Sequence, residues 1–416
     1  MPARRLAARW VLPVAAPPIE CGAVLLGSDG RIEAVGPDAL VPRPAGVPGE
    51  AFPNAILIPG LVNAHTHLEL TGFDFGAPPE PDFRTWIARV RRVKETRGTD
   101  DCLSAARGGL VECWAGGVTT VGDTGDSGSV IRALAELGGS GVVYQEVFGP
   151  HPSQAAESLA GLQRRVAELG RWASGRVRIG VSPHAPYTVS GPLYAAVAAW
   201  AGAEGLPLAV HLAESPAESE LLLHGTGPFA EGWRERGIPL PAGPGCSPVE
   251  WLERHGVLGE RTLCIHVVQA HQADLARLAR SAAAVAHCPL SNAAHGHGAA
   301  PLAGFLAHGI RVGLGTDSVL SVGMPDLLAE ARVARRLAGL DADATLALAT
   351  LGGARALRLE AEVGSLEPGK WGDCAIILPQ SQAGGPAEQV LESRRKDLVA
   401  TFLGGRDVYR AEPVRT

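Results

Sequence analysis

Aromatic residues and lysine are scarce in this chain of 416 residues. Phe, Trp and Tyr together make up 5% of it, and its only lysines are Lys94, Lys370 and Lys396. Few aromatic side chains are available to stack on nucleic-acid bases, and a net charge of −6 indicates no basic surface for phosphates. The composition therefore argues against a nucleic-acid partner.

Long apolar runs are absent as well. No uninterrupted apolar segment is long enough to span a bilayer, and prolines and Glu20 interrupt the N-terminal stretch, so neither a membrane segment nor a signal peptide is expected. The seven cysteines are odd in number, scattered and without a Cys-x-x-Cys pair. This pattern is typical of reduced cysteines, and we expect a cytoplasmic location.

Several familiar catalytic motifs are missing. There is no His-Glu-x-x-His, Walker loop or Gly-x-Gly-x-x-Gly, so no site for a nucleoside triphosphate or nicotinamide cofactor is expected. His67-Leu68-Glu69 matches the His-x-Glu of cytidine-type zinc deaminases, but the Pro-Cys-x-x-Cys that accompanies it is absent. Gly125-Asp-Ser-Gly128 matches a serine-protease motif, yet we expect it to begin a helix capped by Asp126 or Ser127.

Short apolar runs alternate with longer stretches of helical period over most of the chain. Eight strands are predicted, at 56–64, 118–122, 141–148, 177–182, 207–212, 262–268, 283–287 and 311–315. Helices are predicted between them, at 102–115, 154–172, 192–204, 271–281 and 326–338, with another at 343–358. Eight such units predict an α/β fold, a distorted (β/α)8 TIM barrel. The Gly- and Pro-rich stretch 225–248 is expected to be a long loop after the fifth strand.

Both ends of the chain contain short strand candidates. A hairpin is predicted around Ser28-Asp29-Gly30, and later strands are predicted after Gly364 and near 398–403. Neither group is large enough to fold alone. We therefore predict a small β-sandwich domain formed from residues 1–55 and 359–416, beside a barrel hydrolase domain at 56–358.

Histidines and acidic residues gather at the predicted strand ends. His65 and His67 stand two apart on one strand and therefore point to the same side, although a core strand with two incidental histidines is the alternative. Similar residues follow the later strands: His184, His211, Glu214, His266, His287 and Asp317. Chemistry in TIM barrels lies at this end, and imidazole and carboxylate groups bind zinc and similar cations. The remaining histidines, including His295 and His297, are expected in loops or on the surface.

The motifs occur in a recognisable order. They are Pro59-Gly60-Leu-Val-Asn63-Ala-His65-Thr-His67, His211-Leu-Ala-Glu214, His266, His287-Cys-Pro-Leu-Ser-Asn292 and Gly315-Thr-Asp317-Ser. Together they resemble the amidohydrolase superfamily, in the branch of purine-type deaminases and s-triazine chlorohydrolases. The resemblance extends to the aminodeoxyfutalosine deaminase group, which shows His-Thr-His-Leu-Glu and a tryptophan in the following helix.

The resemblance implies one divalent metal per chain, held by His65, His67, His211 and Asp317. Zinc is expected, with iron as the alternative, because both accept these ligands. Other branches bridge two metals through a lysine after the fourth strand, and no lysine stands there in this sequence. One metal is therefore expected rather than two.

The resemblance also implies catalytic roles for Glu214, His266 and Asp317. Bound zinc lowers the pKa of water toward ~7, and the resulting hydroxide would attack an electron-poor ring carbon. Glu214 would carry the proton of that water to the leaving amine, and positioned proton transfer of this kind is worth ~10²–10⁴-fold. His266 would polarise the water or the leaving group, and Asp317 would accept a proton while binding metal.

Six further residues are candidate substrate contacts. They are Glu69, Trp86, Glu146, His184, His287 and Ser318. For His184 the alternative is a capped loop histidine, for His287 a side chain packed inside the barrel, and for the others a surface or core position.

The predicted function is hydrolytic deamination of an amino-substituted heterocycle that resembles an adenine nucleoside, with aminodeoxyfutalosine as the first candidate. One alternative is hydrolysis of a chlorinated triazine or cyclic amide at the same site. Another is a non-catalytic barrel that serves as a binding subunit, which the complete ligand set argues against. A small-molecule partner is expected, no membrane partner, and a homodimer is the assembly considered.

Overall fold

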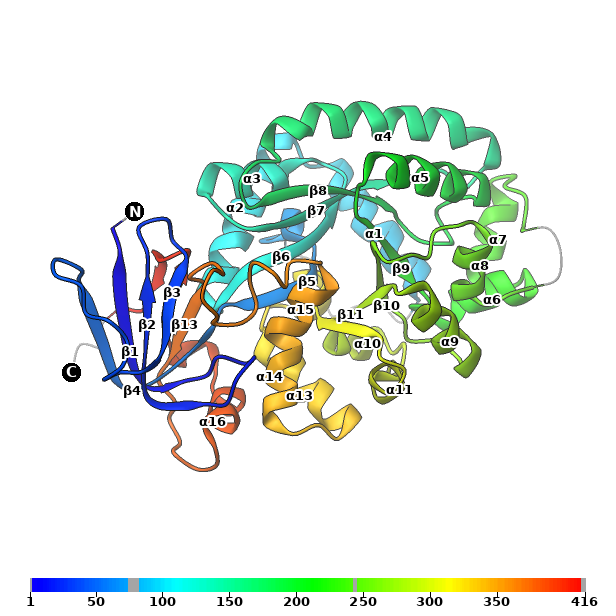
Figure 1. Ribbon diagram of the computed structural model, residues 1–416. Coiled ribbons are helices and arrows are strands. Elements are labelled where there is room, and N and C mark those ends of the chain that lie inside the picture. Colours follow the sequence, from blue (N-terminus) through cyan, green and yellow to red (C-terminus); the bar gives the residue numbers. More distant parts are fainter. Residues whose placement is uncertain (1, 74–81, 242–244, 413–416) are drawn as a thin grey trace.

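The computed structural model describes residues 2–73, 82–241 and 245–412, which build two β-sheets (Figure 1). The larger sheet has eight parallel strands in the order β12-β11-β10-β9-β8-β7-β6-β5. The smaller sheet has seven strands in the mixed order β15-β14-β13-β4-β1-β2-β3. The predicted α/β fold, a barrel with a small β domain, is confirmed.

The eight parallel strands follow one another around the barrel. They are β5 (Leu61–Thr66), β6 (Val118–Gly125), β7 (Gly141–Val147), β8 (Val177–Pro183), β9 (Leu208–Leu212), β10 (Thr262–His266), β11 (Ala284–His287) and β12 (Arg311–Leu314). A parallel bridge between Thr66 and Asp317 joins the first strand to the segment after the last. All eight carboxyl ends therefore open at one mouth.

Helices cover the outside of the barrel (Figure 1). The main ones are α2 (Thr99–Ala115), α3 (Ser129–Leu137), α4 (Ala155–Leu169), α5 (Gly191–Glu204), α9 (Gln272–Ser281), α11 (Leu302–Ala307) and α13 (Leu327–Ala338). In α2, for example, Leu103, Ala106 and Leu110 recur at helical spacing and enter the core between helices and strands. This apolar layer holds each strand end in place.

The barrel interior is filled by alternate strand residues. Val62, Ala64, Tyr144 and Ile265 belong to one buried cluster inside the barrel. The predicted helix 343–358 is present as α14 (Ala342–Ala347), a π-helical turn and α15 (Gly353–Ala356). Because α15 belongs to the same apolar cluster, it closes the end of the barrel opposite the mouth.

The small sheet draws strands from both ends of the chain, as predicted (Figure 1). Its N-terminal strands are β1 (Arg4–Val11), β2 (Ile19–Leu26), β3 (Ile32–Pro37) and β4 (Gly49–Pro59), and its C-terminal strands are β13 (Cys374–Ile377), β14 (Leu398–Leu403) and β15 (Arg406–Arg410). β4 pairs with β1 on one side and β13 on the other. The two ends of the chain thus share one set of backbone hydrogen bonds.

The predicted strand 56–64 is wrong in one respect. Residues 56–59 belong to β4 of the small sheet, and the barrel strand β5 begins only at Leu61. The break falls at Gly60, where a Cβ atom would lie 2.1 Å from Oγ1 of Thr119. No larger residue fits this crossing without displacing Thr119. β4 also passes the predicted domain boundary at residue 55, which stays a prediction.

The predicted loop at 225–248 is also wrong in part. After α6 (Pro216–His224), the helix α7 (Gly227–Glu235) occupies its first half, and α8 (Pro248–Arg254) begins at its end. The reason is local: Pro228 stands in the first turn of α7, where proline is tolerated, while Phe229 and Trp233 recur at i and i+4 and are buried. Residues 242–244 lie outside the described part of the chain.

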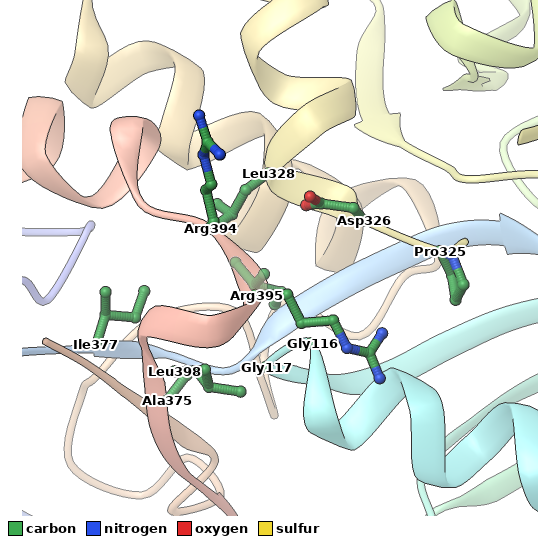
Figure 2. A pocket seen from close by; sticks show the side chains of 11 residues that line it. Gly116, Gly117, Pro325, Asp326, Leu328, Ala375, Ile377, Arg394, Arg395 and Leu398 are labelled. Atoms are coloured by element: carbon green, nitrogen blue, oxygen red, sulfur yellow. The ribbon is translucent and has the colours of Figure 1, made fainter. Parts of the chain in front are cut away.

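A seam joins the small sheet to the barrel, far from the mouth. Figure 2 shows the side chains that line a small hollow there, among them side chains from residues 325–328 and 394–398. The volume of this hollow is about 10 Å³. Leu61, Ala375 and Leu398 line it. Its volume suits at most a single water molecule, so the seam is a packed interface.

Among the described residues, no helix combines the length and apolar character needed to cross a bilayer.

Candidate metal and catalytic site

The four predicted metal ligands converge at the barrel mouth. Oδ1 of Asp317 lies 3.4 Å from Nε2 of His65 and 3.4 Å from Nε2 of His67. Nε2 of His211 lies 3.4 Å from Nε2 of His67. Ligand atoms from three separate strand ends therefore surround one point, at spacings that a single cation can bridge.

The protonation of these imidazoles fits a divalent cation. Neither ring nitrogen of the fully buried His65 has a hydrogen-bond partner among the described residues, and burial lowers its pKa to about 3. Nδ1–H of His67 donates to the carbonyl oxygen of Thr124 at 2.9 Å, and Nδ1–H of His211 to that of His184 at 3.3 Å. Both Nε2 lone pairs are thereby left free toward the cluster, the arrangement that metal-binding histidines adopt.

The backbone turns sharply where it presents Asp317. Its φ is +56°, a left-handed conformation that costs free energy for a residue other than glycine. The N–H of Asp317 donates to the carbonyl oxygen of His65 at 3.0 Å, and Thr66 Oγ1 donates to the carbonyl oxygen of Asp317 at 3.1 Å. Ser291 Oγ donates to Oδ2, which leaves Oδ1 facing the imidazoles. The strained turn is thus held by the first barrel strand.

Glu214 stands beside the cluster. Its Oε1 lies 3.7 Å from Nε2 of His266, and burial raises the pKa of its carboxyl group well above the usual value. Both oxygens of Glu218 accept backbone N–H groups, from Ala213 at 2.7 Å and Glu214 at 3.0 Å, which fixes the turn after β9. Nδ1–H of His266 donates to Oδ1 of Asn292 at 2.9 Å. The predicted acid–base pair is therefore held in contact.

His297 corrects the sequence prediction of a loop or surface residue. Its side chain is only 4% exposed, and its Nδ1 lies 3.6 Å from Oε1 of Glu214. The signal in the sequence was the His-x-His pair at 295–297 that follows Asn292, but no strand orients it. Its place depends on contacts with distant segments.

A cavity of about 750 Å³ opens above the cluster. The helix α1 (Phe83–Glu95) forms one wall, and aromatic side chains line much of the surface: Phe83, Trp86, Tyr187, Phe229 and Trp233. The rings of Tyr187 and Phe229 stack with centroids 4.1 Å apart. Such a wall suits a flat heterocycle.

The predicted substrate contacts divide into two groups. Trp86, Glu146, His184 and Ser318 line the cavity. Glu146 Oε1 lies 4.0 Å from Nε2 of His184, and burial raises the pKa of Glu146 to about 8. In the described part of the chain, Glu69 and His287 are not among the lining residues. His287 is fully buried below the mouth, and Glu69 lies behind α1.

Lys94 is a site residue that the sequence analysis did not identify. Its Nζ on α1 lies 2.6 Å from Oε1 of Glu69 and also contacts Asp126. Ser127 Oγ donates to the other oxygen of Glu69. The predicted capping by Asp126 or Ser127 is wrong, because α3 has Gly128 as its N-cap, without a side-chain hydrogen bond. Ser127 Oγ accepts the N–H of Ser129 at 3.1 Å in the turn before the helix, and Asp126 binds Lys94. The predicted helix, α3, does follow.

Comparison with known proteins agrees with this site. The chain is 35% identical over 320 residues to an aminodeoxyfutalosine deaminase of Deinococcus radiodurans, covering 72% of this chain and 73% of that protein. It is 31% identical over 424 residues to a 5-methylthioadenosine/S-adenosylhomocysteine deaminase of Moorella thermoacetica, covering 98% and 94%. Among solved structures, an adenosine deaminase from Xanthomonas campestris with bound zinc superposes with a TM-score of 0.83 at 26% identity, covering 97% of this chain and 92% of that one.

The family itself is matched directly. The profile described as the amidohydrolase family aligns with residues 56–408, which include every barrel strand and each predicted metal ligand. With its ordered motifs, its parallel barrel and the His–Asp cluster at the mouth, the chain belongs to the amidohydrolase family of hydrolases.

Proposed function

We propose that this protein is a metal-dependent deaminase that hydrolytically removes the exocyclic amino group of an adenine nucleoside, with aminodeoxyfutalosine as the first candidate. The observation that carries the proposal is the convergence of three imidazoles and Asp317 beside Glu214, under an aromatic cavity. The names of the similar deaminases support an adenine-containing substrate.

His65, His67, His211 and Asp317 would hold one divalent cation. Zinc is proposed over iron, because the similar adenosine deaminase structure contains zinc. When bound, the cation supplies the Lewis acidity that makes a water molecule nucleophilic near neutral pH.

Glu214 is the proposed proton carrier. It would take the proton of the attacking water and deliver it to the departing amine, so that ammonia leaves as a neutral molecule. His266 donates its Nδ1–H to Asn292, so its Nε2 is a hydrogen-bond acceptor. We therefore assign to His266 the orientation of the attacking water, rather than proton donation to the leaving group. The sequence prediction left these two roles open.

The cavity suits a nucleoside with a further substituent. Its volume of about 750 Å³ lies in the upper part of the ~300–1,000 Å³ range of small-molecule sites. Trp86, Glu146, His184 and Ser318 are proposed to contact the heterocycle and sugar because they line it. Contacts from Glu69 and His287 stay predictions from the sequence, and the position of Glu69 suits an indirect role through Lys94.

Three further points belong to the proposal. All seven cysteines are free, which supports a cytoplasmic location. A division into residues 1–55 with 359–416 and residues 56–358 is proposed as the domain organisation. A homodimer is the proposed assembly, to be measured by light scattering.

The experiment is a screen for ammonia release over adenine nucleosides, pterins and triazines, with the metal-loaded wild-type protein. Adenine nucleosides should react and Glu214→Gln should lose at least about 10²-fold in kcat while keeping its metal. Dechlorination of a triazine releases chloride and no ammonia, so chloride is measured in parallel. Chloride release from chlorinated triazines, without ammonia release from adenine nucleosides, would replace this function with dechlorination. A fully active Glu214→Gln variant would remove Glu214 from the proton path.

A further inference from the structure

Two histidines, rather than one, face the same oxygen of Glu214. Nε2 of His266 lies 3.7 Å from Oε1, and Nδ1 of His297 lies 3.6 Å from it. Neither ring nitrogen of His297 has a hydrogen-bond partner in the described part of the chain, although only 4% of the side chain is exposed to solvent. Buried polar atoms without partners are rare in folded proteins, and each one calls for an explanation.

The backbone of His297 is held by two segments. Its N–H donates to the carbonyl oxygen of Asn292 at 2.9 Å, and Gln269 Nε2 donates to its carbonyl oxygen at 2.6 Å. Gln269 also donates its backbone N–H to Ala213, the residue before Glu214, at 2.8 Å. The same contacts therefore tie the His297 backbone to the turn that carries Glu214.

The ring itself is also oriented by packing. Phe83 of the cavity wall stands edge-on to it, with centroids 4.5 Å apart and planes at 85°. Asn292, which holds the backbone of His297, also accepts the Nδ1–H of His266 through its side chain. One asparagine thus places both histidines that face Glu214.

We propose that His297 is a positioning residue for this reaction, which engages Glu214 through Nδ1 and holds the carboxyl group in line between the attacking water and the amine. The present separation of 3.6 Å is slightly beyond a hydrogen bond. Catalytic hydrogen bonds are often long without substrate and shorten when it binds. The inference rests on the proposed function, since it takes Glu214 as the proton carrier.

The chemistry of the side chain allows a sharp test. The amide nitrogen of asparagine occupies nearly the place of Nδ1 of histidine, whereas that of glutamine occupies the place of Nε2. His297→Asn should therefore keep most of kcat. His297→Gln and His297→Phe should lower kcat about 10- to 100-fold, with KM changed less than about twofold. Phe preserves the ring that packs on Phe83 and removes only the nitrogens.

The pattern among variants decides between positioning and packing. If the Phe variant retains kcat and the Asn variant loses it, the residue only fills space and the proposal is overturned. His308→Asn, the same substitution at a histidine outside the cavity lining, controls for general effects. Metal content is measured for every variant. If the Phe variant alone loses its metal, the lower kcat comes from the metal site rather than from Glu214, and the proposal is likewise overturned.

A second readout needs no turnover. The protein is labelled with ¹⁵N at histidine, and its NMR spectrum is compared with that of His297→Asn. The ring signals that are missing from the variant's spectrum belong to His297. Glu214→Ala should shift the Nδ1 signal, and Glu388→Gln on the distant helix α16 (Pro386–Glu392) should leave it in place. Unmoved signals in Glu214→Ala would overturn the contact whatever the substrate proves to be. Shifted signals in a protein inactive on adenine nucleosides would instead count against the proposed function.

Discussion

The ammonium group of Lys94 lies 2.6 Å from Oε1 of Glu69, which connects the helix α1 to the segment directly after the proposed ligand His67. Glu69 exposes 2% of its side chain and Lys94 22%. In a chain with only three lysines, this one is buried against two carboxylates. The pair therefore ties one wall of the cavity to the barrel mouth.

Lys94→Met should destabilise the protein by about 3–5 kcal/mol, because it leaves the carboxylate of Glu69 buried without its cation. Urea unfolding of the metal-free protein measures the loss. The exposed Lys396 provides the control, and Lys396→Met should stay within about 0.5 kcal/mol of wild type. An equal effect of both substitutions would mean that the ion pair contributes nothing specific.

Asp126 should make this region sensitive to acid. Burial raises the pKa of Asp126, but the neighbouring Lys94 outweighs this and leaves that pKa below its ordinary value. A carboxyl group whose pKa is lower in the folded state stabilises the fold above its unfolded-state pKa, and this contribution disappears as the pH falls through the folded-state value. Asp126→Asn should therefore be less stable than wild type near pH 7, and the gap should shrink below about pH 4. A gap that widens in acid would contradict this sign.

Removal of a proposed metal ligand should abolish tight metal binding. Wild type should retain about one equivalent of zinc after dialysis, whereas His211→Ala and Asp317→Ala should retain much less. Elemental analysis measures the content, with His308→Ala as a control histidine. A wild-type protein without any transition metal would remove the premise of the site.

Gly60→Ala should test the crossing between the two sheets. Its Cβ would lie 2.1 Å from Oγ1 of Thr119, and such overpacking costs about 1–3 kcal/mol. The added Thr119→Gly substitution should recover part of that loss by removing the clashing side chain. Gly49→Ala, at the first residue of β4 and with no atom within 4 Å of the new Cβ, should be nearly neutral in thermal unfolding.

The barrel and the convergence of the histidines at its mouth were predictable because they depend on local rules. The period of two in β5 places His65 and His67 on one side, and the strand ends of a parallel barrel must share one mouth. The role of Glu214 followed from the resemblance to the amidohydrolase superfamily, and its place just beyond His211 is compatible with that role. These inferences need no knowledge of side-chain contacts between distant segments.

The remaining site residues depend on such contacts. His297 is buried because Gln269 and Asn292 hold its backbone, and neither contact follows from spacing. The sequence pattern alone indicates that Lys94 is a surface residue. Only the fold, in which α1 lies across the cavity, brings Lys94 to Glu69. The single strand expected at 56–64 reads as one apolar run, and only the approach of Thr119 shows why it breaks at Gly60.

The central place of β4 has a consequence for biosynthesis. A nascent chain has completed all eight barrel strands by Leu314, yet β4 still lacks its neighbour β13, which begins at Cys374. Because β4 leads directly into β5, the segment that carries His65 and His67 acquires its full support only when the last strands leave the ribosome. A premature stop codon ahead of β13 would then encode every proposed metal ligand and leave the first two poorly held.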